Sequence, residues 1–247
     1  MSYYQFVAQE TEFWEQINHL IATDRRDPVI LSQLKNRAYD LFNLDAYEGH
    51  IALGVVASLE GNVKAIHACY QQAIEDFSRK PELVASYAES LARVGYFSPA
   101  AELMLEAYYL SPSTLNYLDK AIRLCGMVGR FRFVGELLRI RGKINLQQAA
   151  PFATNIESIL QWMKQNQVTD EQLEQQINLI LSLLQHYHIL ITPRHVEIAL
   201  DEDQQKLYYK IHLAESIEVI AKITTQLTQA TVTTDLPTII NWKIVST

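Results

Sequence analysis

The apolar positions of this chain follow two different rhythms. Up to about residue 190 they recur at steps of three and four, which is the spacing of one helical face. Beyond it they alternate with polar positions, which is the spacing of a strand with one buried side. The pattern therefore predicts a mainly α protein that ends in a small element containing strands.

Glycines divide the helical part into units of equal length. Gly61, Gly95 and Gly129 follow one another at intervals of 34 residues. A residue without Cβ adopts the left-handed conformation at little cost, so each of these glycines suits the tight turn between two antiparallel helices. Three aligned units of this length indicate a helical repeat.

The unit resembles the tetratricopeptide repeat, in which small residues, a turn glycine and a closing proline stand at fixed places. The match is best in the unit that begins at Lys80, through Ala88, Gly95, Ala100, Ala107 and Pro112. It is weaker in the unit before and degenerate in the unit after, and no unit carries the family's tryptophan. The resemblance covers about residues 46–146 and implies an α-solenoid of antiparallel helix pairs.

Further helices are expected on both sides of these units. The apolar positions predict a helix over 3–21 and another over 29–42, which together form a divergent first pair. A helix from Ala150-Pro151 to about Met163 and another after the capping box of Thr169 and Gln172 form a closing pair. We therefore divide the chain into a helical repeat domain at 1–147 and a closing helical hairpin at 148–190.

Residues 191–247 are expected to form a β-β-α-β element. The hairpin register that places Glu197 opposite Lys210 also places Asp201 opposite Lys206, and opposite charges across a strand pair favour that register. An amphipathic helix over 214–230 and a last strand near 240–244 complete the element.

Composition and charge describe the class of protein. The 247 residues are 49% hydrophobic and 20% charged, which is typical of a globular protein with a substantial core. The net charge of -7 argues against a general nucleic-acid surface. No signal peptide or long apolar run stands out, so a cytoplasmic location without a membrane segment is expected.

Catalytic and metal-binding patterns do not stand out in the sequence. It contains no glycine-rich phosphate loop and no HExxH, GxSxG or CxxC motif. The same hairpin register places His195 opposite His212, but neither Cys69 nor Cys125 is near them in sequence. We therefore predict that the protein is not an enzyme and holds no cofactor or metal.

The resemblance to the repeat family also suggests a binding surface. In that family the first helix of each pair lines a concave face that holds a peptide or a partner protein. The positions of this chain that match those lining places are Ile51, Val55, Ser58, Ala85, Glu89, Ala92, Arg93, Asp119, Arg123 and Met127.

Basic residues gather in the third unit, against the acidic balance of the rest. The cluster consists of Arg130, Arg132, Arg139, Arg141 and Lys143. Such a cluster either recognises carboxylates or phosphates on a partner, or pairs with acidic residues of the following helices such as Glu157 and Glu174.

Three functions fit these patterns. The first is a non-catalytic scaffold or adaptor that binds a peptide or partner protein through the concave face of its repeats. The second is a dedicated inhibitor, immunity protein or chaperone that captures one partner through the C-terminal sheet. The third, the least favoured, is a nucleic-acid regulator that uses the arginine cluster.

Overall fold

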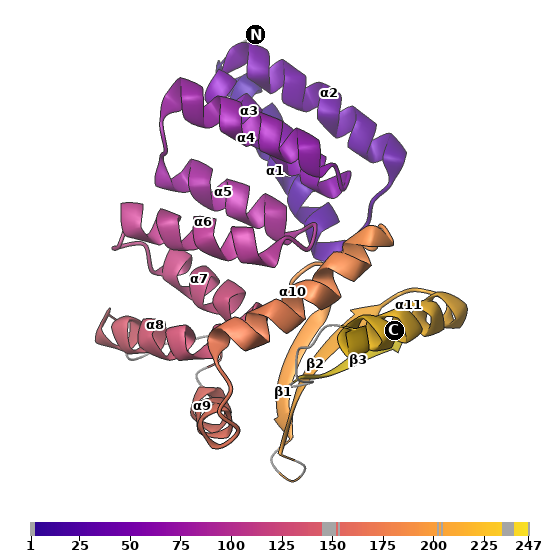
Figure 1. Ribbon diagram of the computed structural model, residues 1–247. Helices are drawn as coiled ribbons and strands as arrows, with labels where there is room; N and C mark the ends of the chain where they lie inside the picture. The colour runs from indigo at the N-terminus through magenta and orange to yellow at the C-terminus, as the bar shows by residue number, and fades with distance from the viewer. Residues whose placement is uncertain are drawn as a thin grey trace. The chain divides into compact units, whose positions relative to one another are not determined.

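A computed structural model describes residues 3–144, 152, 154–201, 203, 205–233 and 240–246 (Figure 1). The chain divides into two compact units, Met1–Val94 and Gly95–Thr247, and each is described by itself below. The boundary lies inside the expected repeat domain rather than at its end, because the helix after Gly95 packs extensively on the helix that follows it. The division at 147 and 190 stays a prediction.

The first unit contains five helices within its described residues. They are α1 (Tyr3–Thr23), α2 (Pro28–Leu44), α3 (Ala46–Leu59), α4 (Val63–Phe77) and α5 (Pro81–Ala92). Side chains placed just before three of them accept hydrogen bonds from their first turns, namely Asp27, Asp45 and Asn62. The helices α1 and α2 confirm the two N-terminal helices that periodicity predicts over 3–21 and 29–42.

The core of the first unit forms around the apolar side of α1. Phe13, Ile17 and Leu20 are buried in one hydrophobic cluster with residues of α2 and α3, Val55 and Val56 among them. Burying large apolar side chains is the dominant favourable term in folding. The helix α1 is therefore an integral part of this unit.

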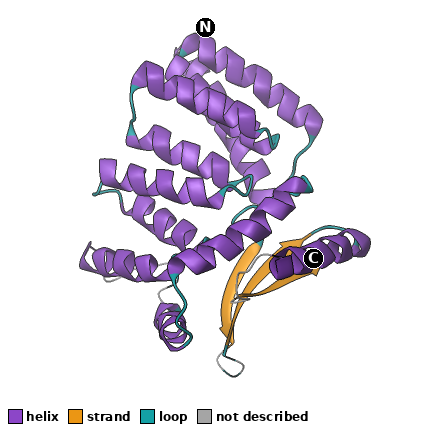
Figure 2. Cartoon of the chain, in the orientation of Figure 1, coloured by secondary structure: helices purple, strands orange, loops and turns teal. Residues whose placement is uncertain are grey.

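The second unit contains helices followed by a small sheet, as Figure 2 shows. Its elements are α6 (Phe97–Leu110), α7 (Leu115–Met127), α8 (Phe131–Ile144), α9 (Ile156–Gln165), α10 (Asp170–His186), β1 (Val196–Asp201), β2 (Lys206–Leu213), α11 (Ile217–Thr233) and β3 (Ile240–Ser246). The expected fold class, mainly helical with a β-β-α-β end, is confirmed.

The boundaries of the closing helices differ in part from the prediction. The helix expected from Ala150-Pro151 begins only at Ile156, because Thr154 and Asn155 form a turn, and positions 150 and 151 lie outside the described residues. The capping box of Thr169 and Gln172 is present and starts α10 as expected.

The sheet has the strand order β1-β2-β3, with β1 antiparallel to β2 and β3 parallel to β2. Glu197 pairs with Lys210 and Asp201 with Lys206, so the predicted register is confirmed. The Lys210 ammonium donates a hydrogen bond of 2.7 Å to Glu197. Gln176 of α10 accepts a hydrogen bond from the backbone N–H of Ile240, at the start of β3.

The three turn glycines adopt the left-handed conformation that the sequence predicts. Their φ angles are 73° at Gly61, 80° at Gly95 and 85° at Gly129. A residue with a side chain is strained at such angles. The spacing of these glycines therefore reflects a backbone requirement that recurs in three successive helix pairs, from α3 to α8.

Candidate partner-binding surface

In the first unit, most of the predicted lining residues are buried. Val55, Ser58, Ala85 and Ala92 lie in the interior, and Ile51 packs partly against the cluster that contains α1. A side chain without exposed surface cannot contact a partner. The prediction that these four buried residues line an open face is therefore wrong for the structure described.

The two charged lining candidates of this unit belong to an internal polar network. The Arg93 guanidinium donates to the hydroxyl of Ser58 at 3.1 Å, and it lies 3.5 Å from the Glu89 carboxylate. Burial lowers the pKa of Arg93, and the nearby Glu89 opposes that shift. Arg93 therefore contributes to the interior of the unit instead of offering its charge to a ligand.

Arg26, which the sequence analysis did not single out, completes this network. Its guanidinium donates to the carbonyl of Leu59 at 3.4 Å and to the carbonyl of Arg93 at 3.5 Å. These carbonyls stand at the C-terminal ends of α3 and α5, where a positive charge complements the helix dipole. Carbonyl groups at the ends of two helices thus accept hydrogen bonds from one side chain.

In the second unit, the predicted lining residues of α7 have different surroundings. Asp119 accepts a hydrogen bond of 2.9 Å from the buried Arg141, and Met127 is buried. Only Arg123 is exposed. Arg123 and Met127 line a small cavity of about 300 Å³ together with Phe152 and two residues of β1, so the C-terminal sheet approaches this face of α7.

The basic cluster is largely engaged within the unit. Arg130 donates to Glu174 at 2.7 and 2.8 Å and also to Glu102, while the Arg132 side chain donates to the carbonyl of Val168. Together with the pair of Arg141 and Asp119, these contacts match the internal interpretation of the cluster. Arg139 and Lys143 remain exposed on α8.

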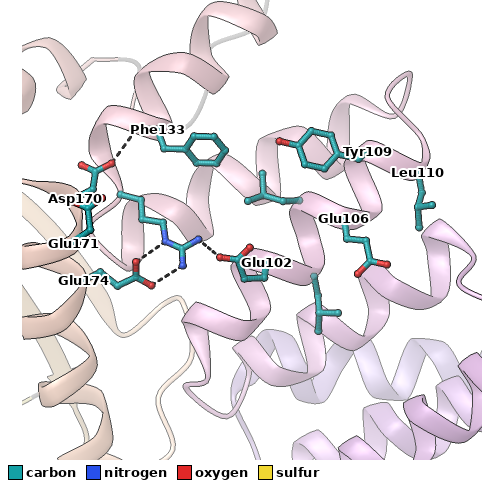
Figure 3. A pocket seen from close by; sticks show the side chains of 11 residues that line it. Glu102, Glu106, Tyr109, Leu110, Phe133, Asp170, Glu171 and Glu174 are labelled. Atoms are coloured by element: carbon teal, nitrogen blue, oxygen red, sulfur yellow. Dashed lines mark hydrogen bonds and ion pairs between the residues drawn. The ribbon is translucent and has the colours of Figure 1, made fainter.

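A groove that the sequence analysis missed opens among α6, α8 and the start of α10 (Figure 3). Its volume is about 760 Å³. The apolar side chains that line it are Leu103, Leu105, Tyr109, Leu110 and Phe133. The charged side chains that line it are Glu102, Glu106, Arg130, Asp170, Glu171 and Glu174.

Arg130 holds the two sides of this groove together. Figure 3 shows Glu102 and Glu174 reaching toward the guanidinium from α6 and α10. Its hydrogen bonds with Glu174 and with Glu102 raise the pKa of Arg130 above its ordinary value, although burial acts in the opposite direction. Because its guanidinium donates hydrogen bonds to the carboxylates of both Glu102 and Glu174, Arg130 fixes the shape of the groove rather than presenting a free cation.

Asp170 fixes the other end of the groove. Its carboxylate accepts hydrogen bonds from the backbone N–H groups of Arg132 at 3.0 Å and Phe133 at 3.2 Å. It thereby caps the first turn of α8, which has no acidic residue of its own. Burial raises the pKa of Asp170, and the two N–H groups oppose that shift.

Comparison with known protein families, curated proteins and solved structures gave no match. Within the described part of the chain, no helix combines the length and the hydropathy needed to cross a membrane. Across the same residues, no three histidine, cysteine, aspartate or glutamate side chains come together as ligands for a metal ion. The groove is therefore interpreted from its own geometry and chemistry.

Proposed function

We propose that this protein is a non-catalytic interaction protein, and that it binds a segment of a partner protein in the groove among α6, α8 and α10. One observation carries the proposal. Tyr109 is 62% exposed and Leu110 is 47% exposed, and both line the groove together with Leu103, Leu105 and Phe133. Large apolar side chains that gather on a surface and are surrounded by polar groups are typical of interaction sites.

The proposal keeps the adaptor role expected from the sequence but moves the binding surface. The first helices of the pairs were expected to line it, whereas the groove uses α6 and α8, the second helices of their pairs, together with α10. Membership of the tetratricopeptide repeat family and a cytoplasmic location belong to the same proposal. The glycine spacing and the left-handed turns support the repeat assignment.

A second candidate function rests on the C-terminal sheet. Because β1 and β3 are the outer strands of the order β1-β2-β3, each has a side that is not paired with β2. A partner strand that adds to such an edge gains main-chain hydrogen bonds, as a dedicated inhibitor or chaperone would use them. The arginine cluster offers less to a nucleic acid, because Arg130, Arg132 and Arg141 already contact groups of the chain itself.

Affinity capture from the source cells tests the proposed function. The variant carries Tyr109→Ser and Leu110→Ser, and the matched control carries Tyr39→Ser and Leu44→Ser on α2, where the side chains are 51% and 59% exposed. We expect one or more proteins to be retained by the natural chain and by the control, and to be lost from the groove variant.

The same experiment separates the two candidates. A third sample lacks residues 191–247, and its circular dichroism shows whether the helices remain. Capture that survives the groove substitutions but is lost with the sheet would overturn the groove proposal and support the inhibitor or chaperone alternative. Equal capture by all samples would contradict both candidates.

A further inference from the structure

An apolar stripe extends from the groove along α8. Phe133 lines the groove, and Ile140 and Ile144 follow it at spacings of seven and four residues. These spacings place the three side chains on the same side of a helix. Ile140 is 40% exposed and Ile144 is 50% exposed. At a rise of about 1.5 Å per residue, the stripe is roughly 16 Å long.

The charge around the groove has one dominant sign. Five carboxylates line it against a single guanidinium, that of Arg130. Glu102 and Glu174 share Arg130, and Asp170 caps α8. Glu106 and Glu171 also line the groove, from α6 and from the first turn of α10. The excess of negative charge favours a positively charged ligand.

We propose that the occupant of the groove is an amphipathic helix of a partner protein, with its apolar side on the groove and the stripe and with lysines or arginines facing Glu106 and Glu171. This inference rests on the proposed function, since it states the chemistry of the partner for the same surface. It adds two properties, the helical periodicity and the positive charge.

The shape of the surface favours a helix over an extended segment. The groove is built from helices, so it offers no row of main-chain groups with which a strand would pair. An amphipathic helix in a groove instead contributes apolar side chains at spacings of three, four and seven. About three helical turns span the 16 Å of the stripe.

The carboxylates that line the groove disfavour acidic partners there, whereas Arg139 and Lys143 are exposed further along α8. An acidic segment or a nucleic-acid backbone would bring like charge against the five carboxylates that line the groove. A basic helix gains long-range attraction that weakens with salt, because exposed charges are screened over about 8 Å at physiological ionic strength.

A display library of random 16-residue peptides, with no bias in charge, provides the probe. The library is selected for binding to the full chain at low salt. The affinity of each enriched peptide is then measured for the natural chain and for three variants. One is the groove variant Tyr109→Ser with Leu110→Ser. The second carries Glu106→Gln and Glu171→Gln, and the third is the control Glu75→Gln on α4, an exposed position outside the groove.

We expect the enriched peptides to be basic, to have apolar residues at helical spacings and to become helical on binding. Removing the two carboxylates should weaken the binding of these peptides by about twofold to thirtyfold, because each exposed ion pair contributes only a modest part of the affinity. Glu75→Gln should leave their affinity unchanged. Circular dichroism confirms that each variant keeps its fold.

The outcomes distinguish this inference from the function on which it rests. One outcome is that binding is lost with Tyr109→Ser and Leu110→Ser, but the peptides are acidic or neutral, or their affinity is unchanged by Glu106→Gln and Glu171→Gln. This outcome overturns the basic-helix inference and leaves the groove function standing. Peptides that bind the groove variant as well as the natural chain overturn the groove function itself.

Discussion

Arginines in the two units perform different tasks. In the first unit, Arg26 and Arg93 donate to backbone carbonyls and hydroxyls among α3 and α5, while the apolar side of α1 packs with Val55 of α3. In the second unit, Arg130 donates hydrogen bonds to two carboxylates on the wall of a groove where Tyr109 and Leu110 are exposed. The first network stabilises an interior, whereas the second shapes a surface.

This difference shows that a repeat pattern does not by itself decide which face is available to a partner. Each unit contains a helix pair with a left-handed turn glycine, Gly61 between α3 and α4 and Gly129 between α7 and α8. In the first, Val55 and Ser58 at the expected lining positions are taken up by α1 and by Arg93. The available surface therefore depends on what the rest of the chain places against each helix.

Phe13→Ala should produce the largest effect, because it removes the ring by which α1 fills the core of the first unit. Phe13 is fully buried, and truncating such a residue costs about 3–5 kcal/mol. Urea denaturation measures the loss. Val29→Ala on the exposed side of α2 is the control and should change stability by less than about 0.5 kcal/mol. A small effect of Phe13→Ala would show that α1 does not pack there.

Two glycine substitutions come next, one within each unit. A Cβ at Gly54 would lie 2.4 Å from the ring of Tyr70, whereas a Cβ at Gly142 on α8 would meet nothing within 4 Å. Gly54→Ala should therefore destabilise by about 1–3 kcal/mol. Gly142→Ala should stabilise by about 0.5–1 kcal/mol, because glycine is unfavourable within a helix. Thermal unfolding measures both, and equal signs would contradict the close packing at Gly54.

Asp170→Ala tests the end of the groove. The substitution removes the acceptor of two backbone N–H groups of α8, so a loss of about 1–2 kcal/mol is expected. Hydrogen exchange at the amides of Arg132 and Phe133 should become faster in the variant. Unchanged exchange at these two amides would mean that the carboxylate does not cap α8.

The smallest effect on stability is expected at the groove surface. Tyr109→Ser and Leu110→Ser change exposed side chains, so together they should alter the free energy of unfolding by less than about 1 kcal/mol. Denaturation monitored by fluorescence checks this value. A larger loss would show that these side chains stabilise the fold, which would weaken their use as probes of binding.

The elements of this structure were predictable where the signal is local. Gly61, Gly95 and Gly129 marked the turns because a left-handed backbone restricts residue choice at a single position. Glu197 and Lys210 fixed the hairpin register because a shift by one residue would separate their charges and turn the apolar residues outward. Thr169 and Gln172 marked the start of α10 through a contact between near neighbours.

The surfaces were not predictable, because they depend on distant parts of the chain. Periodicity showed that α1 has an apolar side, but not that this side packs with Val55. The groove joins α6 to Asp170, which is remote in sequence. One signal was available: Leu103, Tyr109 and Leu110 fall outside the buried stripe of α6, and apolar residues off the buried side of a helix indicate a second contact.

Photocrosslinking from the groove in the source cells tests the central claim most directly. A photoreactive phenylalanine analogue replaces Tyr109 in one sample and Tyr39, the exposed tyrosine of α2, in the other. The account predicts a discrete crosslinked protein from position 109 that is not obtained from position 39. Crosslinking from position 39 alone, or from neither position, would contradict the claim that the groove among α6, α8 and α10 is where this protein holds its partner.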